Sequence, residues 1–493
     1  MMRLPVPLLA AAVGVVALAS TAVATTPSGH DARTLPTAVG ASRASAVRTS
    51  VVCPDLRILP GTLGTTVAVG TGTPGDGSVM LQPAQGDKPG PKNPVLGPGQ
   101  TIGRYSGPLT GPITLSAQGA LSGSLVAEQI SRGNKTTDRG WSEARCEPPR
   151  AQQWFVGAAT TPGDTPTLEL ANPTDTSAVV DVTVLTPSGV QTSSAGNNIT
   201  VAKRSVQRLA LSSLAPNVTV TAVRVTTSTG RVSAAVRDVR TSGETLLGTD
   251  WVPVGSAAAS LTVAGLPNEV IGAIPKRTLF VGVPGDIDAT VQVTVTDASG
   301  TYVPVGLDAV AVGAGTVRAI DLTKALGRKA AAVTVTSSDP AVRLVAGALI
   351  DAASSKGQPI HEIAYLGTAS PLRGAAIVPV VRTAGDVDSA LVVSAPRGQA
   401  SFTLVISPPT GAESRQRITV RAGTTYITSL RARRVPDNST VTIVPDPGTA
   451  PLYAARLIEE NGALGPLLSS FTLLGAPPSQ QVPAVAALPV TGG

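Results

Sequence analysis

Six arginines form an uneven cluster of positive charge near the C-terminal end of the chain. Arg415, Arg417 and Arg421 alternate along an expected β-strand, and a period of two places their side chains on one face. Three more follow at Arg431, Arg433 and Arg434. Such a surface can hold an anionic polymer or lipid headgroups through contacts that salt weakens. A solvated strand face, or an edge that blocks sheet-to-sheet aggregation, produces the same pattern.

Histidine, the usual general base near neutral pH, is scarce in this chain. His30 lies in a stretch without strand alternation, and His361 is followed directly by Glu362. Neighbouring side chains of a strand point to opposite faces, so His361 and Glu362 do not form a pair. No Gly-x-Ser-x-Gly turn offers a nucleophilic serine near them. We therefore expect no enzyme activity.

Carboxylates are the other candidates for chemistry, because glycoside hydrolysis needs two of them beside a sugar cleft. Sugar clefts also favour aromatic platforms, for which twelve aromatic residues in 493 are few. One acidic residue per repeat indicates an exposed strand or turn position, and close aspartate pairs indicate turn residues rather than a Ca²⁺ loop. We expect no metal and no cofactor. The acidic positions are Glu128, Asp238, Asp351 and Glu459, and the aspartate pairs are Asp286 with Asp288 and Asp386 with Asp388.

The chain has two cysteines, Cys53 and Cys146, at the two ends of one segment. In an exported chain this spacing favours a single disulfide that joins the ends of the segment. A pair of free buried thiols is the alternative. No histidine or third cysteine accompanies them, so we expect no zinc site.

Composition predicts an all-β protein. Val, Ala and Leu dominate an apolar fraction of 42%, aromatic residues make up 2%, and 51 Gly and 42 Pro residues interrupt the apolar runs. Val and Thr suit strands, whereas Gly and Pro end them. The net charge is +7. A nucleic-acid-binding protein would interleave its basic residues with aromatic ones for stacking, so we expect no nucleic-acid partner.

A repeat of about 111 residues sets the expected architecture. Gly189, Gly300 and Gly411 are each 111 residues apart. Each glycine ends a similar sequence segment, which consists of an expected strand, a turn and a run of alternating valines. Short strands about ten residues apart are typical of a sandwich or barrel. We expect tandem immunoglobulin-like β-sandwich modules arranged as a rod or arc, with a β-propeller as the alternative. The expected modules are residues 51–150 (the disulfide-linked N-terminal domain), 151–258, 259–372 and 373–477.

The remaining segments suggest export. Residues 1–24 contain Arg3, an uncharged apolar stretch and small residues at Ala22 and Ala24, as in a signal peptide. An uncleaved membrane anchor is the alternative, and it would be the only membrane contact. Residues 25–50 resemble a flexible linker, 70–99 a long exposed loop and 478–493 a Pro/Ala-rich tail. Residues 488–492 match a sortase signal, which we interpret as a coincidence or a truncated signal.

Several short motifs together resemble an uncharacterised family of actinobacterial exported proteins, a domain of unknown function. They are Cys53-Pro54, the Arg-Cys pair that ends at Cys146, the Trp-Phe-Val-Gly that starts at Trp154 and the Asn-Pro-Thr-Asp that starts at Asn172. The resemblance extends over nearly all of the chain after residue 50. It implies association with the cell envelope and assigns no activity.

These observations favour a non-catalytic, exported envelope protein that binds an anionic wall polymer or an envelope protein. One alternative is an extracytoplasmic accessory subunit of a membrane enzyme that builds envelope polymers. The other is a divergent envelope hydrolase, with its site in the 70–99 loop or between modules. A deep pocket lined by two or more carboxylates would favour the hydrolase.

Overall fold

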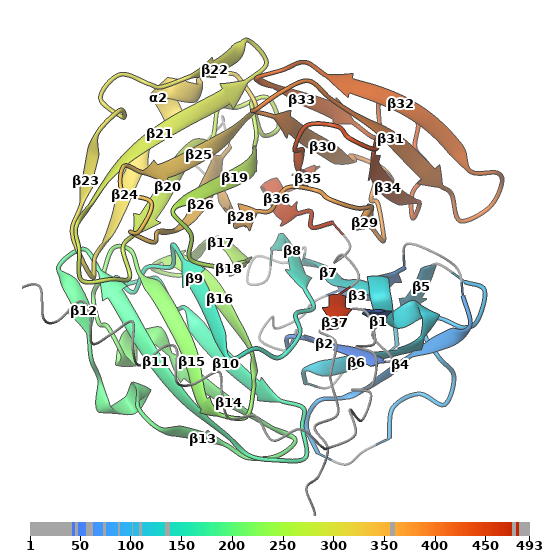
Figure 1. The fold of residues 1–493 in the computed structure, drawn as a ribbon, viewed down its shortest axis with the longest axis horizontal. Helices are drawn as coiled ribbons and strands as arrows, with labels where there is room; N and C mark the ends of the chain where they lie inside the picture. The colour runs from blue at the N-terminus through green and yellow to red at the C-terminus, as the bar shows by residue number, and fades with distance from the viewer. Residues whose placement is uncertain are drawn as a thin grey trace, which may run out of the picture. The chain divides into compact units, whose positions relative to one another are not determined.

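The computed structural model describes residues 42–44, 48–55, 63–71, 75–86, 89–100, 102–107, 111–133, 139–354, 360–475 and 480–482 (Figure 1). The expected signal peptide and the sortase-like pattern lie outside these residues. The chain divides into a large unit, 45–479, and a small one made of 1–44 and 480–493. In the small unit, β1 (Ser42–Ala44) pairs with β37 (Gln480–Val482), within segments expected to be linker and tail.

The large unit consists of antiparallel sheets that pair face to face into four β-sandwiches, which confirms the expected tandem β-sandwich fold. The first sandwich comprises β2 (Arg48–Cys53), β3 (Leu63–Gly70), β4 (Gly77–Pro83), β5 (Ile102–Tyr105), β6 (Ile113–Gly119), the 3₁₀ helix η3 (Ala120–Ser124), β7 (Val126–Gly133) and β8 (Gly140–Arg145). The second comprises β9 (Gln152–Val156), β10 (Thr167–Asn172), β11 (Ala178–Thr186), β12 (Gly189–Gln191), η4 (Ser194–Gly196), β13 (Ile199–Val201), β14 (Ser205–Ala210), η5 (Leu211–Ser213), β15 (Ala222–Thr229), β16 (Ser233–Ser242), β17 (Thr245–Val252) and β18 (Val254–Gly255).

The third and fourth sandwiches repeat this plan. The third comprises β19 (Ser260–Leu266), β20 (Lys276–Gly282), β21 (Ala289–Asp297), β22 (Gly300–Tyr302), β23 (Val310–Val312), β24 (Val317–Asp321), the short helix α2 (Thr323–Leu326), β25 (Ala331–Ser337), β26 (Val345–Ala353), β27 (His361–Leu366) and β28 (Thr368–Ala369). The fourth comprises β29 (Ala376–Val378), β30 (Val387–Ala395), β31 (Ala400–Ser407), β32 (Ser414–Val420), β33 (Thr424–Ser429), β34 (Thr440–Pro445), β35 (Tyr453–Gly462) and β36 (Gly465–Thr472).

Equivalent strands recur in each sandwich at the period seen in the sequence. One sheet of each is four-stranded, with the orders β5-β3-β7-β8, β14-β10-β16-β17, β24-β20-β26-β27 and β33-β30-β35-β36. The repeated segments that end at Gly189, Gly300 and Gly411 contain β10, β20 and β30, which are the second strands of the last three of these sheets. Each segment then continues into the next strand, β11, β21 or β31, which belongs to the opposite sheet. Gly189, Gly300 and Gly411 turn the chain after β11, β21 and β31 with φ of 125°, 150° and 98°, a region that favours glycine.

Burial distinguishes two kinds of strand. β11 and β21 alternate between buried and more exposed residues, because one face covers the sandwich core and the other faces solvent. In β8, β27 and β36, nearly every residue is buried. These strands have a sandwich core on one side and another sandwich on the other.

We call β8, β17, β27 and β36, the last strand of each four-stranded sheet, the junction strands. They contact one another in the cyclic order β8, β17, β27, β36 and back to β8. Figure 1 shows β8, β17 and β36 side by side where the sandwiches meet. The expectation of a rod or arc is therefore wrong, because the first and fourth sandwiches touch. The propeller alternative also fails, since a blade is a single sheet whereas each described module has two.

The first sandwich is pinned by a disulfide between Cys53, at the end of β2, and Cys146, just after β8. This confirms the expected pairing, and it supports an extracytoplasmic location because disulfides persist in oxidising compartments. The expected exposed loop at 70–99 is partly wrong, because β4 lies within it. Val79 and Leu81 alternate in β4 and are buried in the core despite the surrounding Gly and Pro residues. No helix among the described residues is long and apolar enough to cross a bilayer.

Reduction of the Cys53–Cys146 disulfide is expected to lower the free energy of unfolding by about 2–5 kcal/mol, because the unfolded chain regains the freedom of a long loop. Urea unfolding with and without reductant measures the difference. The Cys53→Ser, Cys146→Ser double variant should show the lower stability and no further response to reductant. Equal stability of the oxidised and reduced parent would contradict the assignment.

Candidate functional site

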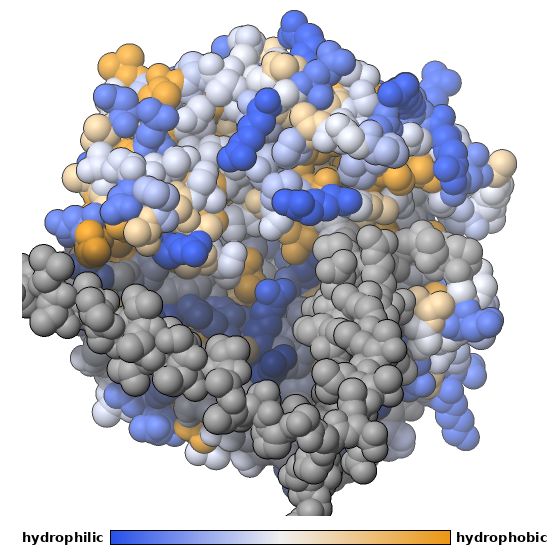
Figure 2. Space-filling model, in the orientation of Figure 1, coloured by the Kyte–Doolittle hydropathy of each residue, from blue (hydrophilic) through white to orange (hydrophobic). Residues whose placement is uncertain are grey.

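Arg415 and Arg417 lie on β32, the edge strand of its sheet, and Arg421 follows directly after it. Arg415 and Arg417 are highly exposed, with 69% and 72% of their side chains accessible, while Ile418 and Val420 are buried beneath them. This alternation places the two arginines on the outward face, as expected. Figure 2 shows strongly hydrophilic side chains gathered over the β31 and β32 part of the surface.

Three of the six arginines are paired with carboxylates. Arg415 contacts Glu413 at 2.8 Å and Arg417 contacts Asp446 at 2.7 Å. Arg431 lies 3.8 Å from Asp386. Exposed ion pairs of this kind contribute only about 0–1 kcal/mol, so the arginines can exchange these partners for the charges of a ligand.

The other three arginines form no ion pair with a carboxylate among the described residues. Arg421 donates to the Ala298 carbonyl at 3.3 Å. Arg433 donates to Gln416 Oε1 on β32 and to Thr428 Oγ1 on β33, and so bridges the two sheets at their open edge. Arg434 is exposed in the turn after β33. Six arginines and two acids between residues 411 and 437 leave a local net charge of +4.

The acidic residues that recur near the end of each repeat do not share one exposed position, contrary to our expectation. Asp351 and Glu459 are partly exposed, but Glu128 and Asp238 are 0% exposed. Glu128 lies on β7 and Asp238 on β16, next to the junction strands. Both strands are covered on two sides, so a side chain on either face enters the interior.

A buried arginine joins the first sandwich to the fourth. Arg456 on β35 donates to both carboxylate oxygens of Glu128, at 3.3 and 3.2 Å, and contacts Glu143 on β8 at 2.8 Å. All three side chains are fully buried. Burial raises the pKa of Glu143 to about 7, against the opposing effect of Arg456, and the pKa of Glu128 is raised for the same reason.

A second buried acid joins the other sandwiches. Glu362 on β27 accepts hydrogen bonds from the backbone N–H groups of Thr249, on β17, and Ile363, at 3.2 and 3.1 Å. Arg139 from the first sandwich lies 3.8 Å from Glu362 and donates to the Pro466 carbonyl of β36. Burial raises the pKa of Glu362 to about 8, and Arg139 opposes the shift.

The second and third sandwiches share a further polar group. The Tyr365 hydroxyl donates to Asp238 at 2.5 Å, and Arg240 donates to both of these residues. Asp250 on β17 accepts from the Tyr365 backbone N–H at 2.8 Å and from Ser469 on β36 at 3.3 Å. Burial holds the pKa of Asp250 well above its usual value. Hydrogen bonds and ion pairs thus link all four sandwiches.

His361 does not converge on a catalytic group. Its ring Nδ1 lies 2.8 Å from Asp351 on the neighbouring strand, and both side chains are partly exposed. Glu362 points to the buried side, as the alternation of a strand predicts. Within the described ranges, no group of three or more His, Cys, Asp or Glu side chains could hold a metal ion.

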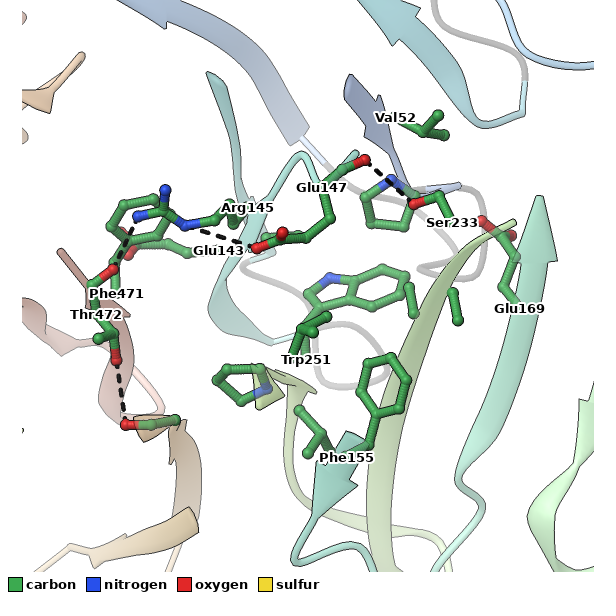
Figure 3. A pocket seen from close by; sticks show the side chains of 18 of the residues that line it. Val52, Glu143, Arg145, Glu147, Phe155, Glu169, Ser233, Trp251, Phe471 and Thr472 are labelled. Carbon is green, nitrogen blue, oxygen red and sulfur yellow. Dashed lines mark hydrogen bonds and ion pairs between the residues drawn. The ribbon is translucent and has the colours of Figure 1, made fainter. Parts of the chain in front are cut away.

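A pocket of about 70 Å³ lies where strands of all four sandwiches meet (Figure 3). Three carboxylates line it, each already paired: Glu143 with Arg456, Glu147 with Arg150 at 3.0 Å, and Glu169 with Arg208 at 2.9 Å. Three aromatic side chains line it as well, although the low aromatic content argued against such a platform. They are Phe155, Trp251 and Phe471.

Sequence reasoning missed Arg139, Arg456 and the three aromatic residues of the pocket. The one signal available was the position of Arg456, a charge inside the apolar run Tyr-Ala-Ala-Arg-Leu-Ile of an expected core strand. A buried charge requires a partner of opposite sign. The identity of that partner, 328 residues away, depends on how the sandwiches pack.

We expect the free energy of unfolding to fall as pH rises from about 4.5 to 8. Glu143 and Glu362 have raised pKa values, so the folded chain binds more protons than the unfolded chain in this window. Each such group contributes a slope of at most about 1.4 kcal/mol per pH unit. Urea unfolding of Glu362→Gln across this range should give a flatter profile, whereas Glu413→Gln, at an exposed position, should keep the parental slope. A parental slope in Glu362→Gln would contradict this assignment.

Replacing Arg456 with Met is expected to lower the free energy of unfolding by about 3–5 kcal/mol, because Glu128 and Glu143 lose their buried partner. The triple variant Glu128→Leu, Glu143→Leu, Arg456→Met removes all three charges and should recover most of the loss. Urea unfolding at one pH compares the three proteins. A single variant as stable as the parent would show that the cluster is not buried.

No curated protein matches the chain. A β-glucuronidase of Bacteroides uniformis is 15% identical over 43% of this chain and 25% of its own, with a TM-score of 0.11, so this chain spans about a quarter of that enzyme's length. The tetra-tandem repeat from the extending region of a large adhesion protein is 15% identical over 87% of this chain and 100% of that chain, also with a TM-score of 0.11. Residues 104–431, most of the chain, match DUF5719, a family of unknown function, and the chain therefore belongs to that family.

Proposed function

We propose that the chain is a non-catalytic, exported protein of the cell envelope that holds an anionic wall polymer on its fourth sandwich. The observation that carries the proposal is the exposed face of β32, where Arg415 and Arg417 project outward next to the arginines that follow β33. The Cys53–Cys146 disulfide supports the exported location. The envelope association also draws on the resemblance to exported proteins seen in the sequence.

The geometry suits a flexible, repeating polyanion better than a small ligand. The arginines extend along an edge strand and the adjoining turn, and their carboxylate partners are themselves exposed or partly exposed. A polymer that carries a charge at each repeat can therefore contact several guanidinium groups at once, with modest strength at each. Attraction between exposed charges is long-ranged at low salt and screened at physiological salt.

A divergent envelope hydrolase is the second candidate, because the junction pocket is lined by Glu143, Glu147 and Glu169. The raised pKa of Glu143, about 7, suits a general acid. Against this role, each carboxylate is paired with an arginine, which leaves none as a free base or nucleophile. Digestion assays on purified wall glycan discriminate the two: release of reducing ends by the parent and not by Glu143→Gln would establish the hydrolase and remove the non-catalytic proposal.

The triple variant Arg415→Gln, Arg417→Gln, Arg421→Gln is expected to bind poly(glycerol phosphate) roughly ten-fold more weakly at low salt. Each cation near an anionic surface contributes up to about 1 kcal/mol, and existing ion pairs reduce that contribution. Binding measured by co-sedimentation or calorimetry at several salt concentrations should show a shallower salt dependence in the variant.

The matched control carries Arg318→Gln, Lys324→Gln and Arg328→Gln, which remove the same charge from exposed positions of the third sandwich. This control should bind the polymer like the parent. If both variants lose binding equally, the polymer responds to net charge rather than to the arginine surface. That result, or polymer binding by the parent that is insensitive to salt, would refute the proposed site.

A further inference from the structure

The junction pocket contains buried polar groups that no described part of the protein satisfies. The indole Nε1 of Trp251 and the hydroxyl of Ser470 are buried without a hydrogen-bond partner, and Glu143 Oε1 is in the same state. Trp251 and Ser470 are each 5% exposed and Glu143 is 4% exposed. All three residues line the pocket, and they come from β17, β36 and β8. An unpaired buried donor or acceptor costs about 1–3 kcal/mol, so a partner is expected from outside the chain.

These groups place an unpaired donor, an unpaired acceptor and an unpaired hydroxyl in one pocket. The indole N–H can only donate, the Glu143 oxygen can accept, and the serine hydroxyl can do either. Figure 3 shows the indole of Trp251 in the middle of the pocket, with its nitrogen turned toward the side on which Glu147 lies and Phe155 on the opposite side. A matching ligand group therefore has one acceptor, one donor and an apolar surface.

Size and charge restrict the group further. One buried water needs about 10–15 Å³ of cavity, so the pocket holds about five non-hydrogen atoms. The charged groups that line it are already paired within the protein, namely the three glutamates and Arg145, which contacts Glu147 and donates to the Thr472 carbonyl. A charged ligand would therefore be buried without a counter-ion, at high energetic cost. The ligand group is neutral.

We propose that the junction pocket binds the acetamido group of an N-acetylated amino sugar. The acetamido carbonyl accepts from Trp251 Nε1, its N–H donates to Glu143 or Ser470, and its methyl group packs against apolar side chains of the lining. The acetamido group alone fills a pocket of this size, so the sugar ring lies at the opening. A peptide bond has the same polar atoms, but it continues on both sides and needs a groove, whereas an acetamido group ends in a methyl and fits a pocket.

The inference is independent of the arginine surface, which lies on a different strand and binds by charge. It reaches beyond polymer binding because it names a neutral sugar and a second site. The triple arginine variant should therefore bind the sugar like the parent, and pocket variants should bind poly(glycerol phosphate) like the parent. Failure of one proposal is thus distinguishable from failure of the other.

Saturation-transfer NMR on the full chain tests the site, with N-acetylglucosamine, glucose and N-acetylalanine N-methylamide as probes. We expect transfer to N-acetylglucosamine, strongest at the acetyl methyl protons, and none to glucose. Trp251→Phe keeps an aromatic side chain and removes the N–H, and it should weaken N-acetylglucosamine binding about five-fold, the effect of one neutral hydrogen bond. Trp154→Phe is the matched control, because Trp154 is another buried indole without a partner and lies outside this pocket.

Three outcomes would overturn the proposal. The first is no transfer to N-acetylglucosamine, which would leave the pocket filled by water alone. The second is equal binding by N-acetylalanine N-methylamide, which would assign the pocket to peptides. The third is unchanged affinity in Trp251→Phe, or an equal loss in Trp154→Phe, each of which would place the sugar elsewhere. Unfolding curves of the two tryptophan variants verify that any loss of binding is not a loss of fold.

Discussion

The contact of Arg456 with Glu128 and Glu143 is the interaction on which the arrangement of the large unit depends. Moving such ions out of water costs several kcal/mol each, and only close mutual contact offsets this cost. The guanidinium group therefore has one acceptable position, between two carboxylates contributed by a sandwich that is 328 residues away in the chain. The cluster selects a single way of packing the first sandwich on the fourth. Because apolar replacements of such clusters are often neutral for stability, we infer that its main effect is on specificity.

The other polar contacts of the junction follow the same principle. Glu362, Asp250 and Asp238 each bridge at least two sandwiches and are almost fully buried. Apolar packing alone would hold the sandwiches together without fixing how their strands are aligned, since hydrophobic contact is not directional. The junction strands are covered on both sides, so their polar side chains have no route to water. The result is one unit built from repeated modules rather than a flexible string of them.

The pocket is a consequence of this meeting of four sandwiches. Each contributes a strand end or turn, and the space between them is lined by aromatic side chains that the chain otherwise uses sparingly. The arginine surface has a different origin, because it lies on the solvent-facing side of an edge strand that is not one of the junction strands. One chain thus presents an enclosed pocket at the junction and an exposed, basic surface on its fourth sandwich.

The sequence predicts what depends on local pattern. The spacing of Gly189, Gly300 and Gly411 and the alternating valines of β11 and β21 are enough to predict tandem β-sandwiches, and two cysteines in one segment predict their disulfide. The outward face of Arg415 and Arg417 also follows from alternation. What depends on packing between modules could not be predicted: the burial of Glu128, its pairing with Arg456 and the pocket that Trp251 and Phe471 both line. A strand that is buried on both faces carries no alternation, so its inward charges resemble surface residues.

Calorimetry of the purified chain tests most directly whether the sandwiches form one unit. A shared junction with buried ion pairs predicts that residues 45–479 unfold together, in one transition whose calorimetric enthalpy is close to its van't Hoff enthalpy. Several resolved transitions, or a calorimetric enthalpy several times the van't Hoff value, would mean that the sandwiches unfold independently. That result would contradict the account.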